Sequence, residues 1–362
     1  MKKLRCFLLA AALIASIAPS TLVLAQTPPA MRPYKVVNLD RVGGPGGFDY
    51  VLADSDARRL YIPRGNRVTV FDLDTLKPLG EIPNTNSVHG VAVDSGAHHG
   101  FSSSQPVVMW DTRTLATIRI IPVQGRPDGI LFDPGTQRVF ILSHEAPNAT
   151  VIDAQDGSVV GTIGDLGGAP EQGASDSRGH LFFDLEDKDQ VAAVDANTLR
   201  VTAHYGLGGK GGAPAGLALD VKNHTLFVCG RKPQTAVMLN ADDGSIIASL
   251  PIGSGVDSAE FNPATMEAFS SQRDGTLTVI RENSPTQFAV EQTVQTKLGA
   301  KTSTLDVRTN QIFLITADRA PAPPPPSSTP SPGAAPAGTA HGRGSPMVPG
   351  SFTIIVVRRS TE

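Results

Sequence analysis

The 362-residue sequence contains little cysteine, little tryptophan and little charge. Its two cysteines, Cys6 and Cys229, argue against a disulfide scaffold, an iron–sulfur cluster and a cysteine-rich zinc site. A C-x-x-C-H motif is absent, which excludes covalently attached haem. Amphipathic segments of helical length are also missing, and 36 glycines and 29 prolines favour many short elements joined by turns.

Residues 1–25 have the three parts of a secretory signal peptide. A basic start with Lys2 and Arg5 precedes an apolar run, and the small residues Val23 and Ala25 form a cleavage site. The apolar run is short for a membrane span, which needs about 20 residues. We therefore expect an exported protein, periplasmic or secreted, without a membrane span after cleavage.

The mature chain is expected to be mildly acidic. Cleavage removes three positive charges, so the net charge changes from −3 to −6. Nucleic-acid binding needs a cationic face, so this charge argues against it without excluding a local basic patch. Cleavage also leaves Cys229 as the single cysteine, so no internal disulfide is expected.

One sequence pattern occurs seven times between residues 46 and 316. Each copy has a polar or small pair, an apolar run, a turn rich in Asp, Asn and Gly, and a second apolar run, which is typical of a β-hairpin. Further apolar runs joined by D-x-x-T or D-x-x-D-G follow most copies. The copies are spaced by about 42 residues, the length of a four-stranded propeller blade. The residues aligned before the first apolar runs are Asp49, His89, Asp128, Gln172, Ala215, Asp257 and Thr302.

The two ends of the chain complete the seventh copy. One apolar run, SFTIIVVRRS, follows it, and an unmatched run, YKVVNLD, precedes the first copy. Pairing these runs would complete a blade and remove exposed sheet edges. We therefore predict an all-β fold over residues 34–362, a seven-bladed β-propeller with four-stranded antiparallel blades, closed by the N-terminal strand in blade seven. A two-sheet sandwich would not need seven copies, and a six- or eight-bladed ring would require dropping or adding one.

A proline-rich stretch at residues 320–350 interrupts the seventh copy. Its Pro, Ala, Gly and Ser residues supply too little apolar surface to form a core. We therefore predict a disordered surface insert within blade seven.

The repeats resemble the YVTN-type repeats of bacterial propellers, and the chain from Tyr34 to Arg359 resembles the YncE family. The copy LYIPRGNRVTVFDLDT is the most similar, although a literal Y-V-T-N string is absent. The M-W-D-T string at 109–112 is similar to a WD repeat, but Trp110 is the only tryptophan. The YncE resemblance implies an exported seven-bladed propeller, usually without an assigned reaction. Some relatives bind DNA, and distant ones are lactonases or redox-enzyme subunits, but no catalytic motif matches here.

In a four-stranded blade, the loop entering the inner strand and the loop between the second and third strands open on one face, where binding sites are expected. The predicted ligand-binding residues on this face are Asp49, Arg64, His89, Asp128, His144, Arg231, Asp257 and Arg273. Oxygen ligands from Asp49, Asp128 and Asp257 would suit a divalent cation, and the arginines would suit an anionic ligand. The same side chains would also suit turn capping or a hydrated channel lining.

The leading functional prediction is a non-catalytic, monomeric exported propeller that presents this face to a ligand or protein partner. No cofactor is predicted beyond the divalent cation. The alternative is a metal-dependent hydrolase of a lactone or related ester, with His89 as the base. DNA binding through Arg64, Arg231 and Arg273 is a further alternative, as is a role as a redox-partner subunit.

Overall fold

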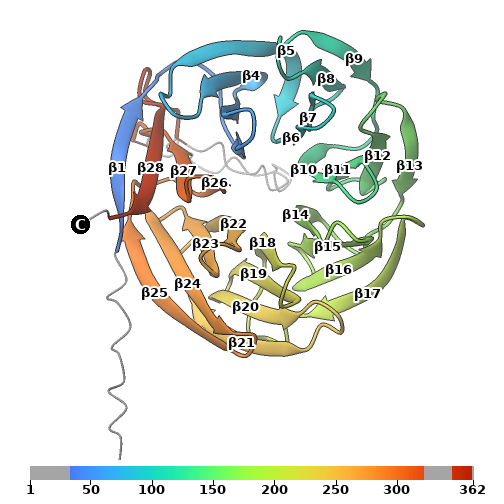
Figure 1. The fold of residues 1–362 in the computed structure, drawn as a ribbon, viewed down its shortest axis with the longest axis vertical. Helices are drawn as coiled ribbons and strands as arrows, with labels where there is room; N and C mark the ends of the chain where they lie inside the picture. The colour runs from blue at the N-terminus through green and yellow to red at the C-terminus, as the bar shows by residue number, and fades with distance from the viewer. Residues whose placement is uncertain (1–32, 322–344, 361–362) are drawn as a thin grey trace, which may run out of the picture. The chain divides into compact units, whose positions relative to one another are not determined.

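The computed structural model describes residues 33–321 and 345–360. Within these ranges, strands β1 to β28 form seven four-stranded antiparallel sheets arranged as blades around one axis (Figure 1). The predicted seven-bladed β-propeller is confirmed. The same residues contain no helix long and apolar enough to span a membrane.

The first four blades follow one another along the chain, each built from its inner strand outward. Blade one contains β2 (Leu52–Asp54), β3 (Arg59–Pro63), β4 (Gly65–Asp72) and β5 (Pro78–Val88). Blade two contains β6 (Val91–Asp94), β7 (His99–Ser102), β8 (Val107–Asp111) and β9 (Thr117–Ile121). Blade three contains β10 (Pro127–Asp133), β11 (Arg138–Ser143), β12 (Ala149–Asp153) and β13 (Val159–Ile163). Blade four contains β14 (Pro170–Ser175), β15 (His180–Leu185), β16 (Gln190–Asp195) and β17 (Arg200–Gly206).

The remaining blades complete the ring. Blade five contains β18 (Pro214–Asp220), β19 (Thr225–Arg231), β20 (Gln234–Asn240) and β21 (Ile246–Pro251). Blade six contains β22 (Val256–Asn262), β23 (Glu267–Gln272), β24 (Thr276–Ser284) and β25 (Gln287–Gln295). Blade seven takes strands from both ends of the chain, namely β26 (Thr302–Asp306), β27 (Gln311–Thr316), β28 (Thr353–Arg359) and, outermost, β1 (Tyr34–Arg41).

The same side-chain turn follows the inner strand of every blade. An Asp or Asn carboxyl or amide oxygen accepts a hydrogen bond from the backbone N–H two residues later, which sets the direction of the hairpin. The seven residues are Asp54, Asp94, Asp133, Asp176, Asp220, Asn262 and Asp306. Because this turn recurs at the same place, it gives each blade a common register.

Ring closure joins β1 to β28 in antiparallel register, from Tyr34 opposite Arg359 to Arg41 opposite Thr353. This pairing is the one predicted from the two terminal apolar runs. It places the first described strand beside the last one, where the blue and red ends of the chain meet (Figure 1).

A group of charged and hydrogen-bonding side chains reinforces the closure, and we call it the closure clasp: Tyr34, Glu267, Arg281, Glu291 and Arg359. The Tyr34 hydroxyl donates to Glu267 Oε2 at 2.8 Å, and Arg281 Nη2 lies 2.7 Å from Glu267 Oε1. Arg359 also pairs with Glu267 and lies 3.2 Å from Glu291 Oε1. The clasp therefore links the N-terminal strand, the C-terminal strand and blade six.

Apolar side chains fill the space between neighbouring blades. Trp110 is fully buried there, and its ring lies 5.9 Å from that of Tyr61 in the preceding blade. A Cβ atom at Gly100 would lie only 2.3 Å from the indole. Glycine at position 100 is therefore what allows the single tryptophan to pack inside the sheet.

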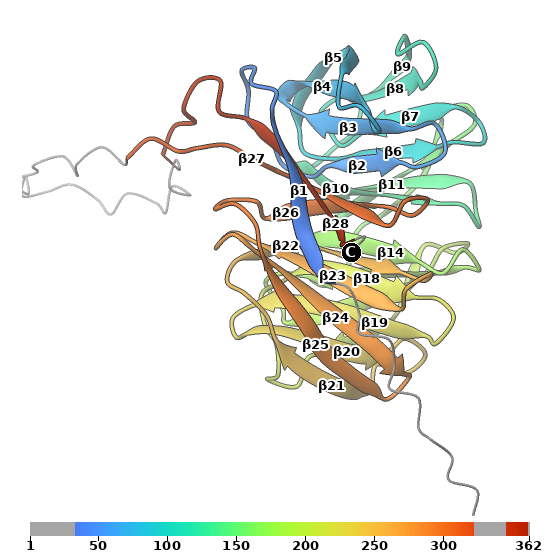
Figure 2. The same cartoon turned by 60° about the vertical axis from the view of Figure 1, so that its left-hand side comes forward.

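The connection between β27 and β28 begins and ends with ordered contacts. Arg319 bridges to Met347, and the Ala320 N–H donates to Pro346 O at 2.8 Å. Figure 2 shows the described ends of this connection, after β27 and before β28, extending from the ring. Both ends of the predicted insert, 320–350, therefore have defined contacts, while residues 322–344 lie outside the described residues, as does the predicted signal peptide at 1–25.

Candidate binding site at the channel mouth

Each blade contributes one residue to the mouth of the central channel, five positions before its turn Asp or Asn. This spacing places Asp49 before Asp54, and Glu171 before Asp176. The seven residues are Asp49, His89, Asp128, Glu171, Ala215, Asp257 and Lys301. In blade five this position is Ala215, which offers only a methyl group. Arg231, the last residue of strand β19 in the same blade, contacts the mouth residues instead.

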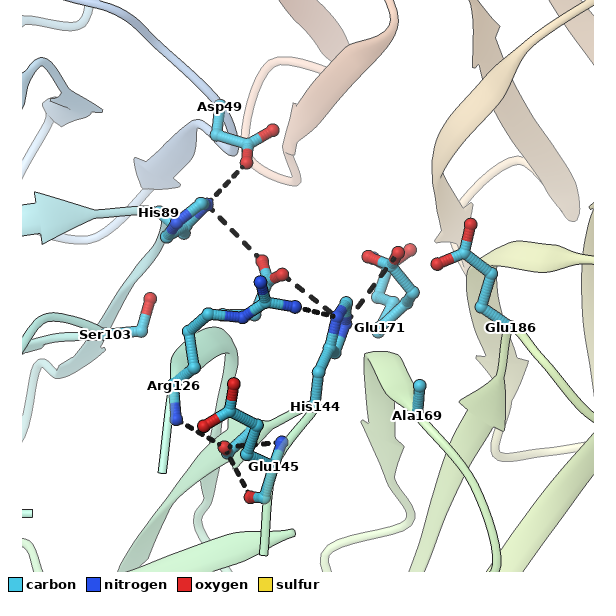
Figure 3. Close-up of polar contacts among 12 residues, drawn as sticks. Asp49, His89, Ser103, Arg126, His144, Glu145, Ala169, Glu171 and Glu186 are labelled. Carbon is cyan, nitrogen blue, oxygen red and sulfur yellow. Dashed lines mark hydrogen bonds and ion pairs between the residues drawn. The ribbon is translucent and has the colours of Figure 1, made fainter. Parts of the chain in front are cut away.

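The mouth residues of blades seven, one, two and three form a chain of contacts, and Figure 3 shows the part of it from Asp49 and His89 to His144. Lys301 Nζ lies 3.1 Å from Asp49 Oδ1, and Asp49 Oδ2 lies 2.8 Å from His89 Nδ1. The same nitrogen lies 3.5 Å from Asp128 Oδ1. His144, from the β11–β12 connection, places Nε2 3.4 Å from Asp128 Oδ2. Asp128 therefore faces one histidine with each of its oxygens.

The chain of contacts continues until it closes on itself. Glu171 Oε1 lies 3.9 Å from His144 Nε2 and 4.0 Å from Arg231 Nη2. Arg231 forms an ion pair with Asp257, and Asp257 forms an ion pair with Lys301. Four acids and four bases thus alternate around the mouth, and we call these eight residues the mouth ring.

Negative charge exceeds permanent positive charge at the mouth. The ring contains four carboxylates but only two permanent cations, Arg231 and Lys301. Glu186 adds a carboxylate through its ion pair with Arg231, and the fully buried Asp184 adds a carboxyl group near Glu186. Even with Arg126, whose guanidinium lies 3.3 Å from His144, six carboxyl groups face only three permanent cations. An anionic ligand, which the arginines suggested, is therefore disfavoured at this site.

Burial and this charge excess shift the acidity of the ring. Burial raises the pKa of Glu171 to about 9, with help from Glu186 and Asp128. Burial also raises the pKa of Asp128. The Asp49 hydrogen bond raises the pKa of His89. Burial opposes ionisation of Asp49 too, but the bond to His89 and the charge of Lys301 lower its pKa. The least compensated carboxyls thus lie on the Asp128–Glu171 side.

Two large side chains cross the centre of the ring one residue deeper. The Tyr50 hydroxyl of blade one donates to Glu171 Oε2 of blade four at 3.1 Å. Gln172 Oε1 accepts hydrogen bonds from the backbone N–H groups of Leu217 and Ala259, at 3.0 and 3.1 Å. At this depth blade three has Gly129, where a Cβ atom would lie 2.0 Å from Glu171 O. Glycine therefore allows the blades to approach closely around these two side chains.

The structure brings together six of the eight predicted ligand-binding residues: Asp49, His89, Asp128, His144, Arg231 and Asp257. Asp257, also predicted as a metal ligand, is occupied by two cationic side chains, Arg231 and Lys301. Among the described residues, the two groups of nearby ligand atoms that could hold a metal ion contain Asp49 and Asp128 together with histidines, and neither contains Asp257. Metal binding at this face stays a prediction.

Arg64 and Arg273 lie apart from the mouth ring. Arg64 is buried, and its guanidinium donates to the carbonyls of Gly43 and Gly44 and lies 3.8 Å above the Phe352 ring. Burial lowers its pKa to about 10. Arg64 therefore holds the chain before blade one instead of facing a ligand. Arg273 is exposed in the turn between β23 and β24.

Sequence reasoning missed Glu171 and Lys301 by one residue each. The alignment selected their neighbours Gln172 and Thr302 because it matched the apolar runs. A register shift between Pro170 and Gly173 disturbs the strand alternation in blade four. Counting back five residues from the turn aspartates would have identified both residues, because that spacing is the same in all seven blades.

A second concavity, of about 480 Å³, lies between blades four and five, at the ends of the blades away from the mouth. Phe182, Tyr205 and Leu219 are among its apolar lining residues. Two histidines at this concavity are each bonded to an aspartate at 2.7 Å, His180 to Asp176 and His224 to Asp242. The sequence analysis did not predict it.

Comparison with known proteins identifies the fold. No family model and no curated protein matches the chain. The structure of U3-55K has a TM-score of 0.68 and 12% identity, covering 89% of this chain and 98% of that one. The RRP9 WD40 repeats have a TM-score of 0.69 and 12% identity, covering 90% and 97%. A chain of the mitotic checkpoint complex has a TM-score of 0.65 and 14% identity, covering 86% and 96%. The chain therefore shares the seven-bladed β-propeller scaffold of these proteins.

Proposed function

We propose that this protein is an exported propeller of the YncE type that binds a positively charged ligand, a divalent cation, at its channel mouth. The observation that carries the proposal is the mouth ring, in which carboxylates outnumber permanent cations around two histidines. Export is supported by the signal-peptide pattern at residues 1–25, and the family by the repeat motifs.

The ligand atoms at the mouth suit a metal ion better than an organic cation. Two groups, Asp49–His89–Asp128 and Asp128–His144–Glu171, each offer three donor atoms within 4.8 Å of one another. Mixed imidazole and carboxylate donors are typical of sites for Zn²⁺, Mn²⁺ or Fe²⁺. An organic ammonium would instead be satisfied by carboxylates alone. The acidic mouth also argues against DNA binding at this face.

Isothermal titration of the metal-free protein with Mn²⁺, Zn²⁺ and Ca²⁺ tests the proposal. We expect saturable binding of at least one of these ions to the wild type and its loss in Asp128→Asn. The control is Asp242→Asn, which changes a carboxylate bonded to a histidine far from the mouth. Absence of binding by all three ions to the wild type would refute the proposal.

A metal-dependent hydrolase is the second candidate, and one contact favours it. Asp49 Oδ2 accepts from His89 Nδ1 at 2.8 Å, an arrangement that orients a histidine for proton abstraction through Nε2. An ion at Asp128–His144–Glu171 would then activate the water. The candidate predicts ion-dependent lactone hydrolysis that His89→Gln abolishes while ion binding at the other group persists. Turnover unaffected by His89→Gln would exclude this role.

A further inference from the structure

We infer that the channel mouth binds two divalent cations bridged by Asp128. The inference rests on the proposed cation binding and specifies its stoichiometry and ligands. One ion would be held by Asp49, His89 and Asp128, and the other by Asp128, His144 and Glu171.

The orientation of Asp128 is the first argument. Its Oδ1 faces His89 Nδ1 at 3.5 Å, and its Oδ2 faces His144 Nε2 at 3.4 Å. A carboxylate that bound a single ion would direct both oxygens toward that ion. Alternatively, it would direct one oxygen toward the ion and accept a hydrogen bond at the same site with the other. Here the two oxygens are divided between two histidines, which is the geometry of a bridging carboxylate.

The outer carboxylates of the two groups are the second argument. Asp49 binds Lys301 through Oδ1 and turns Oδ2 toward His89. Glu171 accepts from Tyr50 through Oε2 and turns Oε1 toward His144. In each group a neighbouring donor anchors one oxygen and leaves the other facing the histidine. Such supporting contacts orient metal ligands in protein sites.

The charge at the mouth is the third argument. Six carboxyl groups at the mouth face three permanent cations, Arg126, Arg231 and Lys301. This excess of acidic groups favours the binding of divalent cations. Carboxylates buried without compensating charge are costly, so the ions would relieve this repulsion.

Arg126 regulates access to the second group. Its Nη2 lies 3.3 Å from His144 Nδ1. A permanent positive charge this close to a ligand opposes the entry of a cation, so Arg126 would have to move away as the ion binds. Arg126 is exposed, which permits this movement.

Titration with Mn²⁺, followed by electron paramagnetic resonance of the loaded protein, tests the inference. We expect two ions per wild-type chain and the signal of an exchange-coupled pair. One ion per chain, or two ions without coupling, would overturn the inference and leave the proposed cation binding intact. Absence of bound Mn²⁺ would overturn the inference, and absence of Zn²⁺ and Ca²⁺ binding as well would overturn the proposed cation binding.

Variants assign the ions to their ligands. His89→Ala and His144→Ala should each bind one ion without the coupled signal, and Asp242→Asn should bind two. Retention of two coupled ions by either histidine variant would contradict the assignment. Arg126→Gln should bind the second ion more tightly than the wild type. Unchanged or weaker binding would contradict the role of Arg126, and this variant changes only an exposed side chain.

Discussion

Two buried glutamates show how the same residue type serves two purposes in this molecule. In the closure clasp, burial opposes the ionisation of Glu267, but its hydrogen bonds and the charge of Arg359 keep its pKa below the usual value. In the mouth ring, burial and neighbouring carboxylates raise the pKa of Glu171 to about 9. The difference lies in the partners: the clasp matches acids with arginines, while the mouth leaves acids in excess.

This contrast separates a stabilising cluster from a binding cluster. The clasp contains two glutamates and two arginines, so its charges compensate one another inside the fold. The mouth contains more acids than permanent cations, and the raised pKa values of Asp128 and Glu171 show that protons take up part of this excess when no cation is bound. A protein that held such an excess for stability alone would gain nothing from it, because uncompensated buried charge lowers the free energy of unfolding.

The largest expected effect is on the clasp. Glu267→Gln removes the charge that Arg281 and Arg359 share and should lower the free energy of unfolding by about 3–5 kcal/mol, as for other broken buried pairs. Denaturant titration of the variant and the wild type measures this difference in the free energy of unfolding. The matched control is Glu81→Gln in β5, an exposed partner of Arg67, which should cost less than about 1 kcal/mol. Equal effects of the two variants would remove the distinction between the clasp and an ordinary surface pair.

A third cluster of acidic residues, Glu282 and Asp220, allows the comparison of buried acids to be tested by changing the pH. Burial raises the pKa of Glu282 from 4.5 to about 7, with Asp220 nearby. Between these values the folded protein holds a proton that the unfolded chain has lost, so stability should fall as pH rises from 4.5 to 7. Glu282→Gln removes this loss and should make the variant more stable than the wild type at pH 8. The full shift corresponds to about 3 kcal/mol, and partial solvent screening reduces the expected gain to about 2 kcal/mol. Asn223 donates to Glu282 Oε1, a contact that glutamine can keep.

Thermal or denaturant unfolding at pH 5 and pH 8 checks this prediction. The difference between variant and wild type should be small at pH 5 and larger at pH 8. A difference that does not change with pH would show that Glu282 stays ionised in the folded protein.

The smallest expected change in stability is at the mouth. Glu171→Gln replaces a carboxyl that favours its neutral form, so the free energy of unfolding should change by less than about 1 kcal/mol. The same variant should weaken Mn²⁺ binding by more than about tenfold, because it removes a direct ligand. A loss of stability as large as that of Glu267→Gln would show that both clusters serve the fold.

Much of the fold could be predicted because its signals are local. Apolar alternation and the turn aspartates, such as Asp54 and Asp133, recur within each repeat, and the unmatched run at Tyr34 required a partner at the other end. The mouth residues Asp49, His89 and Asp128 could be placed on one face for the same reason. The contacts between these residues could not be predicted from the sequence, because they depend on how the separate blades are positioned around the axis.

The amino-acid sequence by itself determined the seven repeats, the closing strand pair and the face on which the polar loops gather, because turn chemistry and strand alternation act over a few residues. Only the tertiary structure decided that Arg64 is buried over Phe352, that Asp257 is paired with Lys301, and that Asp128 lies between two histidines. These contacts join side chains from different strands, and most of them from different blades, so their distances are set only when the blades pack together in the ring.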